Sequence, residues 1–192
     1  NSFVTANFTL GRSVTAVQII DDDTPGVTVT QSGGTTAVTE GGATDSYTLV
    51  LTSQPTANVP ITLNPGSQLS AAPTPLTFTP ANWNEAQTVT VTAVDDAIAE
   101  GSHSGTVTHT AASSDAVYNG FVIASVSATI SDNDNAGVSV VESGGSTAAT
   151  EGGATDSYTV VLTSQPTSDV AVILGVGAQA SLSPSNLTFT AA

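Results

Sequence analysis

The stretch SVSATISDND, residues 125–134, combines two features that determine how the whole chain is interpreted. Val126, Ala128 and Ile130 alternate with serine and threonine, which places their side chains on one face of a half-buried β-strand. Two aspartates, Asp132 and Asp134, then end the stretch. Neighbouring carboxylates repel one another unless a cation lies among them. We therefore expect a strand that ends at a cation-binding junction, with an earlier counterpart at residues 21–23.

The same period of two recurs along the chain, and no segment sustains the 3.6-residue period of a helix. Glycine, proline, asparagine and aspartate separate the alternating segments. This pattern predicts an all-β chain, built as an immunoglobulin-like Greek-key β-sandwich. We predict strands near residues 27–31, 46–52, 58–63, 75–79, 86–94, 103–110 and 122–130.

An internal repeat organises the chain at a spacing of 137 − 26 = 111 residues, from Gly26 to Gly137. The sequence TEGGATDSYT occurs unchanged at 39–48 and 150–159, and VLTSQPT at 50–56 and 161–167. The repeat divides the chain into the last strands of a preceding unit, one complete sandwich and the first part of the next unit, at residues 1–23, 24–134 and 135–192. Near-identity of this kind is typical of long arrays that arose by duplication.

The last part, residues 135–192, carries only the first four strands of a unit, which would leave an apolar face and open edges in water. Two explanations stay open. Either the chain is a fragment of a longer array, or the hairpin at residues 1–20 of another chain completes the sandwich by strand exchange.

The composition limits the partners of the chain. The 192 residues carry 16 acidic side chains and one basic side chain, Arg12, for a formal charge of −15. Nothing in the chain can neutralise phosphate, which argues against nucleic acid, and no apolar run is long enough for membrane insertion. Cysteine, methionine and lysine are absent, as suits a secreted chain on a cell surface. The terminus at Asn1 lacks the pattern of a signal peptide, so we expect any such signal to lie outside this sequence.

Acidic residues mark three places in the complete unit that a sandwich can bring to one pole. Glu40 lies near the start of the unit, Asp95, Asp96 and Glu100 lie between the fifth and sixth predicted strands, and the junction after residue 130 ends the unit. Loops of this kind supply carboxylate, amide and carbonyl oxygens, including the amide oxygen of Asn133, and Ca²⁺ takes about 6–8 oxygen ligands. For any single one of these acids, a role in a turn is the simpler explanation.

The order of these segments resembles the Calx-beta domain. The resemblance rests on Glu40-Gly41-Gly42, on Phe78 and the turn after it, on residues 90–96 with Glu100, and on residues 128–134. Calx-beta domains have an immunoglobulin-like fold, occur in the calcium-sensing part of sodium–calcium exchangers, and recur in tandem in bacterial surface and adhesion proteins. The resemblance implies a similar fold here and Ca²⁺ as the bound ion.

Carried over position by position, the resemblance implies the following calcium ligands: Glu40, Asp95, Asp96, Glu100, Asp132 and Asp134. The sequence also departs from the family pattern. It has no aspartate near Leu69-Ser70, a histidine at 103 where the family has a glutamate, and Asn133 in place of an aspartate. These departures imply fewer ions or weaker binding.

Other chemistry finds little support in the sequence. His103 and His109 have neither a cysteine nor a third histidine beside them, so a zinc site is disfavoured and histidines on a strand face are expected. No serine or threonine lies in a nucleophile motif, so we predict no enzymatic activity. Trp83 could stack on a sugar, although a tryptophan that enters a strand more often covers the end of a core.

These observations lead to one main functional hypothesis and two alternatives. The main hypothesis is a structural or adhesive repeat of a secreted bacterial surface protein, filament or biofilm matrix, in which calcium stiffens the joints between neighbouring repeats of the same protein. One alternative is a module that binds a glycan or a protein through Trp83, with calcium incidental. The other is a calcium sensor, which the near-identical tandem units disfavour.

Overall fold

The computed structural model describes residues 4–10, 13–20 and 22–191, and it contains β-strands joined by turns and two short 3₁₀ turns. Within these residues no helix is long and apolar enough to cross a membrane. The strands are β1 (Val4–Leu10), β2 (Ser13–Ile19), β3 (Val27–Gln31), β4 (Thr36–Thr39), β5 (Asp45–Leu51), β6 (Val59–Asn64), β7 (Leu69–Ala72), β8 (Leu76–Phe78), β9 (Gln87–Ala93), β10 (His103–Ala111), β11 (Val126–Ser131), β12 (Val138–Glu142), β13 (Tyr158–Leu162), β14 (Val170–Ile173) and β15 (Asn186–Phe189).

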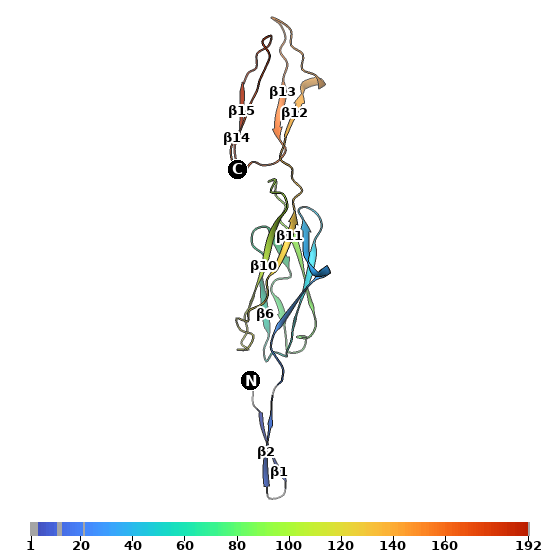
Figure 1. The fold of residues 1–192 in the computed structure, drawn as a ribbon, viewed down its shortest axis with the longest axis vertical. Helices are drawn as coiled ribbons and strands as arrows, with labels where there is room; N and C mark the ends of the chain where they lie inside the picture. The colour runs from blue at the N-terminus through green and yellow to red at the C-terminus, as the bar shows by residue number, and fades with distance from the viewer. Residues whose placement is uncertain (1–3, 11–12, 21, 192) are drawn as a thin grey trace.

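The middle of the molecule is a β-sandwich of two sheets (Figure 1). One sheet has the order β3-β5-β9-β7, and the other has the order β4-β11-β10-β6-β8. The pairs are antiparallel except β4 with β11, which run parallel from Thr36↔Ala128 to Thr39↔Ser131. The all-β sandwich predicted from the alternating pattern is confirmed.

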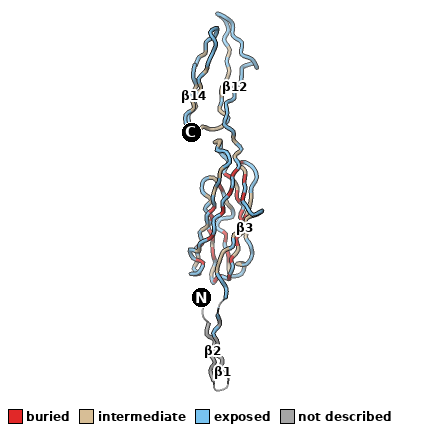
Figure 2. The backbone as a smooth tube through the Cα atoms, in the orientation of Figure 1, coloured by how far each residue is buried: buried red, intermediate tan, exposed pale blue. Residues whose placement is uncertain are grey.

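The core of the sandwich consists of the side chains that the alternation assigns to one face. Figure 2 shows the buried residues concentrated in the sandwich at the middle of the molecule. The largest fully buried side chains include Tyr47, Tyr118 and Phe78. Trp83 is half-buried and packs against this core, so it covers apolar surface, as the sequence favoured.

Two strands and one boundary differ from the prediction. The alternating pattern did not predict β4 and β7, which have four residues each. The last strand of the unit was predicted from residue 122 but begins at Val126. The ladder between β10 and β11 ends at the pair Val107↔Val126, and the rest of β10 pairs with β6, so Val122 stays exposed.

The segments on either side of the sandwich are hairpins (Figure 1). The predicted N-terminal hairpin forms as β1 paired with β2, and Arg12 in its turn lies outside the described residues. On the other side, β12 pairs with β13 through Val138↔Leu162, as β3 pairs with β5 through Val27↔Leu51. The residue numbers of Val138↔Leu162 are those of Val27↔Leu51 plus 111, so the two hairpins have the same register.

The second C-terminal hairpin follows the same rule. The pair Val170↔Phe189 of β14 and β15 repeats the pair Val59↔Phe78 of β6 and β8 at the same offset. Counterparts of β9, β10 and β11 would fall beyond residue 192, and the apolar side chains that they would cover are exposed. These include Val138 and Val140, whose counterparts Val27 and Val29 are half-buried and pack against the core of the sandwich.

Candidate metal centre

The predicted acidic residues meet at one pole of the sandwich because of the strand directions. Thr39 and Ser131 are partners in the parallel ladder, so β4 and β11 end side by side, and the backbone N–H of Glu40 donates to the carbonyl oxygen of Ser131 at 3.0 Å. Strand β9 ends and β10 begins at the same pole, joined by residues 94–102, which we call the acidic loop. The segment 132–134 after β11 completes the site.

Glu40 is the most buried acid of this pole, with 3 % of its surface exposed. Its Oε2 is buried and has no hydrogen-bond partner within the described part of the chain. Burial raises the pKa of its carboxyl group, and the negative charges of Asp132 and Asp96 raise it further. A buried carboxylate without a partner is costly, so this oxygen is suited to a bound cation.

Asp134 repeats this situation on the neighbouring segment. Its Oδ2 is also buried, and no hydrogen-bond partner for it lies among the described residues. Burial, followed by the charges of Asp132, Asp95 and Asp96, raises the pKa of Asp134. One carboxylate oxygen from each of Glu40, Asp96 and Asp134 lies within 4.8 Å of the others, which is close enough to hold one ion.

Asp132 has a different role from its acidic neighbours. Its Oδ2 accepts hydrogen bonds from the backbone N–H groups of Glu100 and Gly101, both at 2.6 Å, and its Oδ1 accepts one from the N–H of Asp134 at 2.7 Å. The bonds from Asp134 and Gly101 lower the pKa of Asp132 most strongly. Asp132 therefore ties the acidic loop to the end of β11, and it falls outside the groups of close carboxylates.

Asp95 is held by an amide. Asn133 Nδ2 donates to Asp95 Oδ1 at 3.0 Å and to the carbonyl oxygen of Glu40 at 3.2 Å. The amide nitrogen thus faces these oxygens, whereas the sequence analysis assigned the amide oxygen of Asn133 to the ion. Gly41 makes room for this contact, since its φ is +59° and an added Cβ would lie 3.0 Å from Asn133 Nδ2.

A second group forms around His103 at the start of β10. Its Nε2 lies 3.4 Å from Glu100 Oε2 and 3.7 Å from Glu40 Oε1. Gln68 Nε2 donates to Glu100 Oε2 at 2.7 Å. Sequence analysis missed the part played by Gln68, although it precedes Leu69, where an expected aspartate was absent. His103 lies on strand β10, where a strand-face histidine was expected, and its ring faces two carboxylates.

His109 lies on the same strand and is half-buried. Its Nε2 lies 2.9 Å from the hydroxyl oxygen of Tyr47, a fully buried residue of the core. Burial lowers the pKa of His109 and favours its neutral form. This histidine therefore belongs to the core packing and is remote from the acidic pole.

The chemistry of the pole fits a hard divalent cation. Glu40, Asp96 and Asp134 supply carboxylate oxygens, which Ca²⁺ and Mg²⁺ prefer. Two of these carboxylates have a buried oxygen without a partner and a raised pKa, as expected where acids are assembled for a positive charge. The geometry therefore brings together four of the six predicted ligands in groups around Glu40, whereas Asp132 and Asp95 are engaged in hydrogen bonds.

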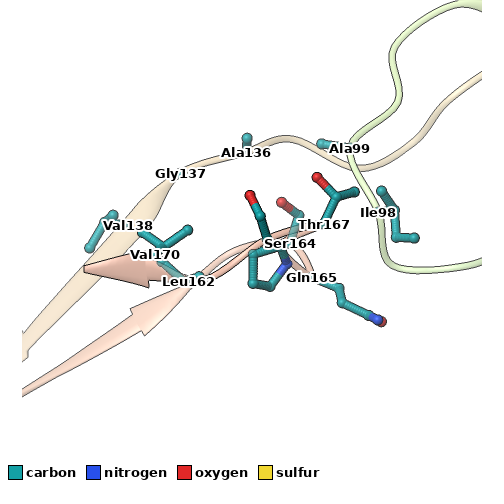
Figure 3. Close-up of a pocket in the computed structure, with 12 residues that line it drawn as sticks. Ile98, Ala99, Ala136, Gly137, Val138, Leu162, Ser164, Gln165, Thr167 and Val170 are labelled. Carbon is teal, nitrogen blue, oxygen red and sulfur yellow. The ribbon is translucent and has the colours of Figure 1, made fainter. Parts of the chain in front are cut away.

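The acidic loop also contacts the next unit. Its ends carry the acids, and its middle, residues 97–99, lies at the turn between β13 and β14. The N–H of Gln165 donates to the carbonyl oxygen of Ala97 at 2.6 Å. Figure 3 shows Ile98 and Ala99 across a crevice from Ala136 and Thr167. One loop thus forms part of the acidic site and part of the contact between the two units.

Comparisons with known proteins add a likeness of architecture. No family model matches the chain, and no curated protein matches it. A solved structure described as the apo form of the Calx CBD1 domain is similar over 56 % of this chain and 98 % of that domain, with 18 % sequence identity and a TM-score of 0.40. We base the candidate metal centre on the residues of this chain alone.

Proposed function

We propose that this chain is a calcium-dependent structural repeat, in which Ca²⁺ at the acidic pole fixes the joint between one β-sandwich and the next. One observation carries the proposal. The acidic pole contains two buried carboxylate oxygens without partners, on Glu40 and Asp134, and it shares the acidic loop with the contact to the following unit. A cation bound there would act on the pole and on the joint together.

Repulsion between carboxylates indicates how a bound ion would change the joint. Without an ion, the carboxylates of Glu40, Asp96 and Asp134 repel one another across distances of no more than 4.8 Å between their nearest ligand atoms. A bound Ca²⁺ would remove this repulsion and hold the ends of the acidic loop, so that Ala97 keeps its hydrogen bond to Gln165. Residues 135–137 connect the site to β12 directly, which gives the ion a second route to the joint.

The wider role that we propose is mechanical. Near-identical repeats, a charge of −15 and the absence of cysteine support a repeat of a secreted bacterial surface or adhesion protein, a filament or a biofilm matrix. Its partners would be neighbouring repeats, either along one chain or by head-to-tail strand exchange. The exposed apolar side chains of β12 to β14 support contact with further strands.

Thermal unfolding of the 192-residue chain in calcium and in chelator tests the proposal. At a Ca²⁺ concentration about a hundredfold above Kd, binding to the folded state alone adds about 2.7 kcal/mol of stability. We expect a higher unfolding midpoint and a smaller hydrodynamic radius by sedimentation velocity. The variant Asp96→Asn should lose most of this response, because it removes one of the three clustered carboxylates.

Glu85→Gln is the matched control. Glu85 is exposed and precedes β9, whereas the acidic loop follows that strand. The substitution removes one negative charge away from the pole and should leave the calcium response intact. An equal midpoint and equal radius in calcium and in chelator for the unsubstituted chain would refute the proposed role of calcium.

A further inference from the structure

The acidic pole contains a nitrogen donor beside its carboxylates. His103 Nε2 lies 3.4 Å from Glu100 Oε2 and 3.7 Å from Glu40 Oε1, and ligand atoms of these three residues lie within 4.8 Å of one another. Glu40 also has its buried, unpartnered Oε2 here. Two acids and an imidazole are thus directed at a common point, beside the group of Glu40, Asp96 and Asp134.

The hydrogen bonding of the imidazole ring indicates which nitrogen can bind a metal ion. His103 Nδ1 lies 2.8 Å from the carbonyl oxygen of Gly101, and a carbonyl oxygen can only accept, so Nδ1 carries the proton. In the neutral ring, Nε2 then has a lone pair that faces two carboxylates, and its hydrogen-bond contact is a long one, 3.5 Å from Gln68 Nε2. A metal ion between the three groups would replace this long contact. A backbone carbonyl that fixes the ring through its other nitrogen is the usual support of a metal-binding histidine.

We propose that Glu40, Glu100 and His103 form a second subsite at this pole, for a divalent transition-metal ion of the zinc class. An imidazole nitrogen suits Zn²⁺ and its neighbours in the first transition row, whereas Ca²⁺ takes oxygen ligands almost only. Three protein ligands with an open fourth position are a familiar zinc arrangement. The exposure of Glu100 leaves room for water in that position.

The neighbours of the subsite support the assignment. Gln68 donates to Glu100 Oε2 and orients this carboxylate. Glu40 belongs to both groups and has one oxygen near His103 and another without a partner, so it can serve two ions. The inference shares Glu40 with the proposed calcium site, but zinc binding at His103 does not require that calcium binds.

Titration of the EDTA-stripped, dialysed 192-residue chain with ZnCl₂ at pH 7.5 tests the subsite by calorimetry. We expect saturable binding, weakened roughly tenfold or more in His103→Gln because a ligand is lost. Glu85→Gln should bind as the unsubstituted chain does. Titration with CoCl₂ gives a second readout, since four-coordinate Co²⁺ absorbs visible light much more strongly than the hydrated ion, and His103→Gln should lose this increase in absorption.

The variant His103→Glu separates the two metal proposals. It restores a carboxylate at position 103, so zinc binding and the cobalt absorption should fall while the response of the unfolding midpoint to calcium is kept or increased. Equal zinc affinity in the unsubstituted chain and His103→Gln would overturn the inference. So would an absence of zinc binding, which would leave the calcium response to be judged separately.

Discussion

Glu40 is the residue on which both metal groups depend. It is buried near Asp132, Asp96 and Glu100, whose negative charges raise its pKa, whereas His103 lowers it. Its raised pKa has a consequence for metal-free stability. A carboxyl group with a folded-state pKa above its unfolded value contributes stability at low pH, and that contribution is lost as the pH rises through the folded pKa.

The substitution Glu40→Gln should therefore have opposite effects with and without metal. In chelator at pH 7.5 it removes a repelled charge, so the unfolding midpoint should be equal or higher. In calcium the variant should lose most of the stabilisation, about 2.7 kcal/mol at a hundredfold excess over Kd. Parallel calorimetric melts of the two proteins measure both effects, and a full calcium response in the variant would contradict a ligand role for Glu40.

The pH dependence of the same pair gives a further check in chelator. As the pH falls toward 4.5, the unsubstituted chain should gain stability relative to Glu40→Gln. The raised pKa of Glu40 lets it take up a proton more readily in the folded chain than in the unfolded chain, whereas the glutamine of the variant takes up none. The two proteins must be compared with each other because the lowered pKa of His109 changes the stability of both in the opposite direction. As the pH falls below about 6.5, the contribution of His109 to stability is lost. A constant difference between the two midpoints over this range would argue against the raised pKa.

Asn133 offers a substitution that should improve the site. Its amide donates to Asp95, and the earlier junction has Asp22 at the equivalent position. Asn133→Asp should lower the metal-free midpoint by repulsion and tighten calcium binding, by roughly tenfold or about 1.4 kcal/mol, as ligand charge increases. Calcium titration calorimetry measures the change, with Asn135→Asp as a control for an added charge in the same segment. Weaker binding in Asn133→Asp would contradict the assigned geometry.

At the scale of elements, the sandwich depends on a close approach between β10 and β7. Gly105 on β10 faces Leu69, and an added Cβ would lie 2.6 Å from Leu69 Cδ1. Gly105→Ala should destabilise the domain by about 1–3 kcal/mol through overpacking. Ser104→Ala on the same strand, at an exposed position, should change stability little. Equal denaturation midpoints for these two variants would show that the sheets can separate freely at this point.

The strands show what a sequence pattern can predict. Alternation over five to nine residues predicted most strands of the sandwich, because burial of one face leaves a clear period of two. It could not predict β4, where the four residues Thr36–Thr39 pair with β11 far along the chain. That parallel pairing also brings Glu40 beside residues 132–134. The sequence could therefore predict the acidic pole only from the general tendency of loops in a sandwich to meet at its ends.

The sequence predicted that the acidic residues lie at one pole, but it did not predict the role of each one. Spacing shows that Asp132 follows a strand, but its hydrogen bonds to Glu100 and Gly101 depend on the path of the acidic loop. The same holds for His103, whose partners Glu40, Gln68 and Glu100 come from three separate segments. Chemistry decided by such long-range contacts has no local signal in the sequence.

At the scale of the whole molecule, the units follow one another along a single long axis (Figure 1). The equal registers of β3 with β5 and of β12 with β13 show that the repeat in sequence is a repeat in strand pairing. In an array of this form, small changes of angle at each joint accumulate, so control of the joint decides whether the array is stiff.

Distances across the joint test the central claim most directly. The chain contains no cysteine, so spin labels can be attached at Thr90→Cys on β9 and Ser139→Cys on β12, both exposed positions. Pulsed electron paramagnetic resonance should give a broad distance distribution in chelator and a narrow one in calcium, and adding Glu40→Gln should abolish the narrowing. Equal widths with and without calcium would contradict the claim that the acidic pole sets the joint.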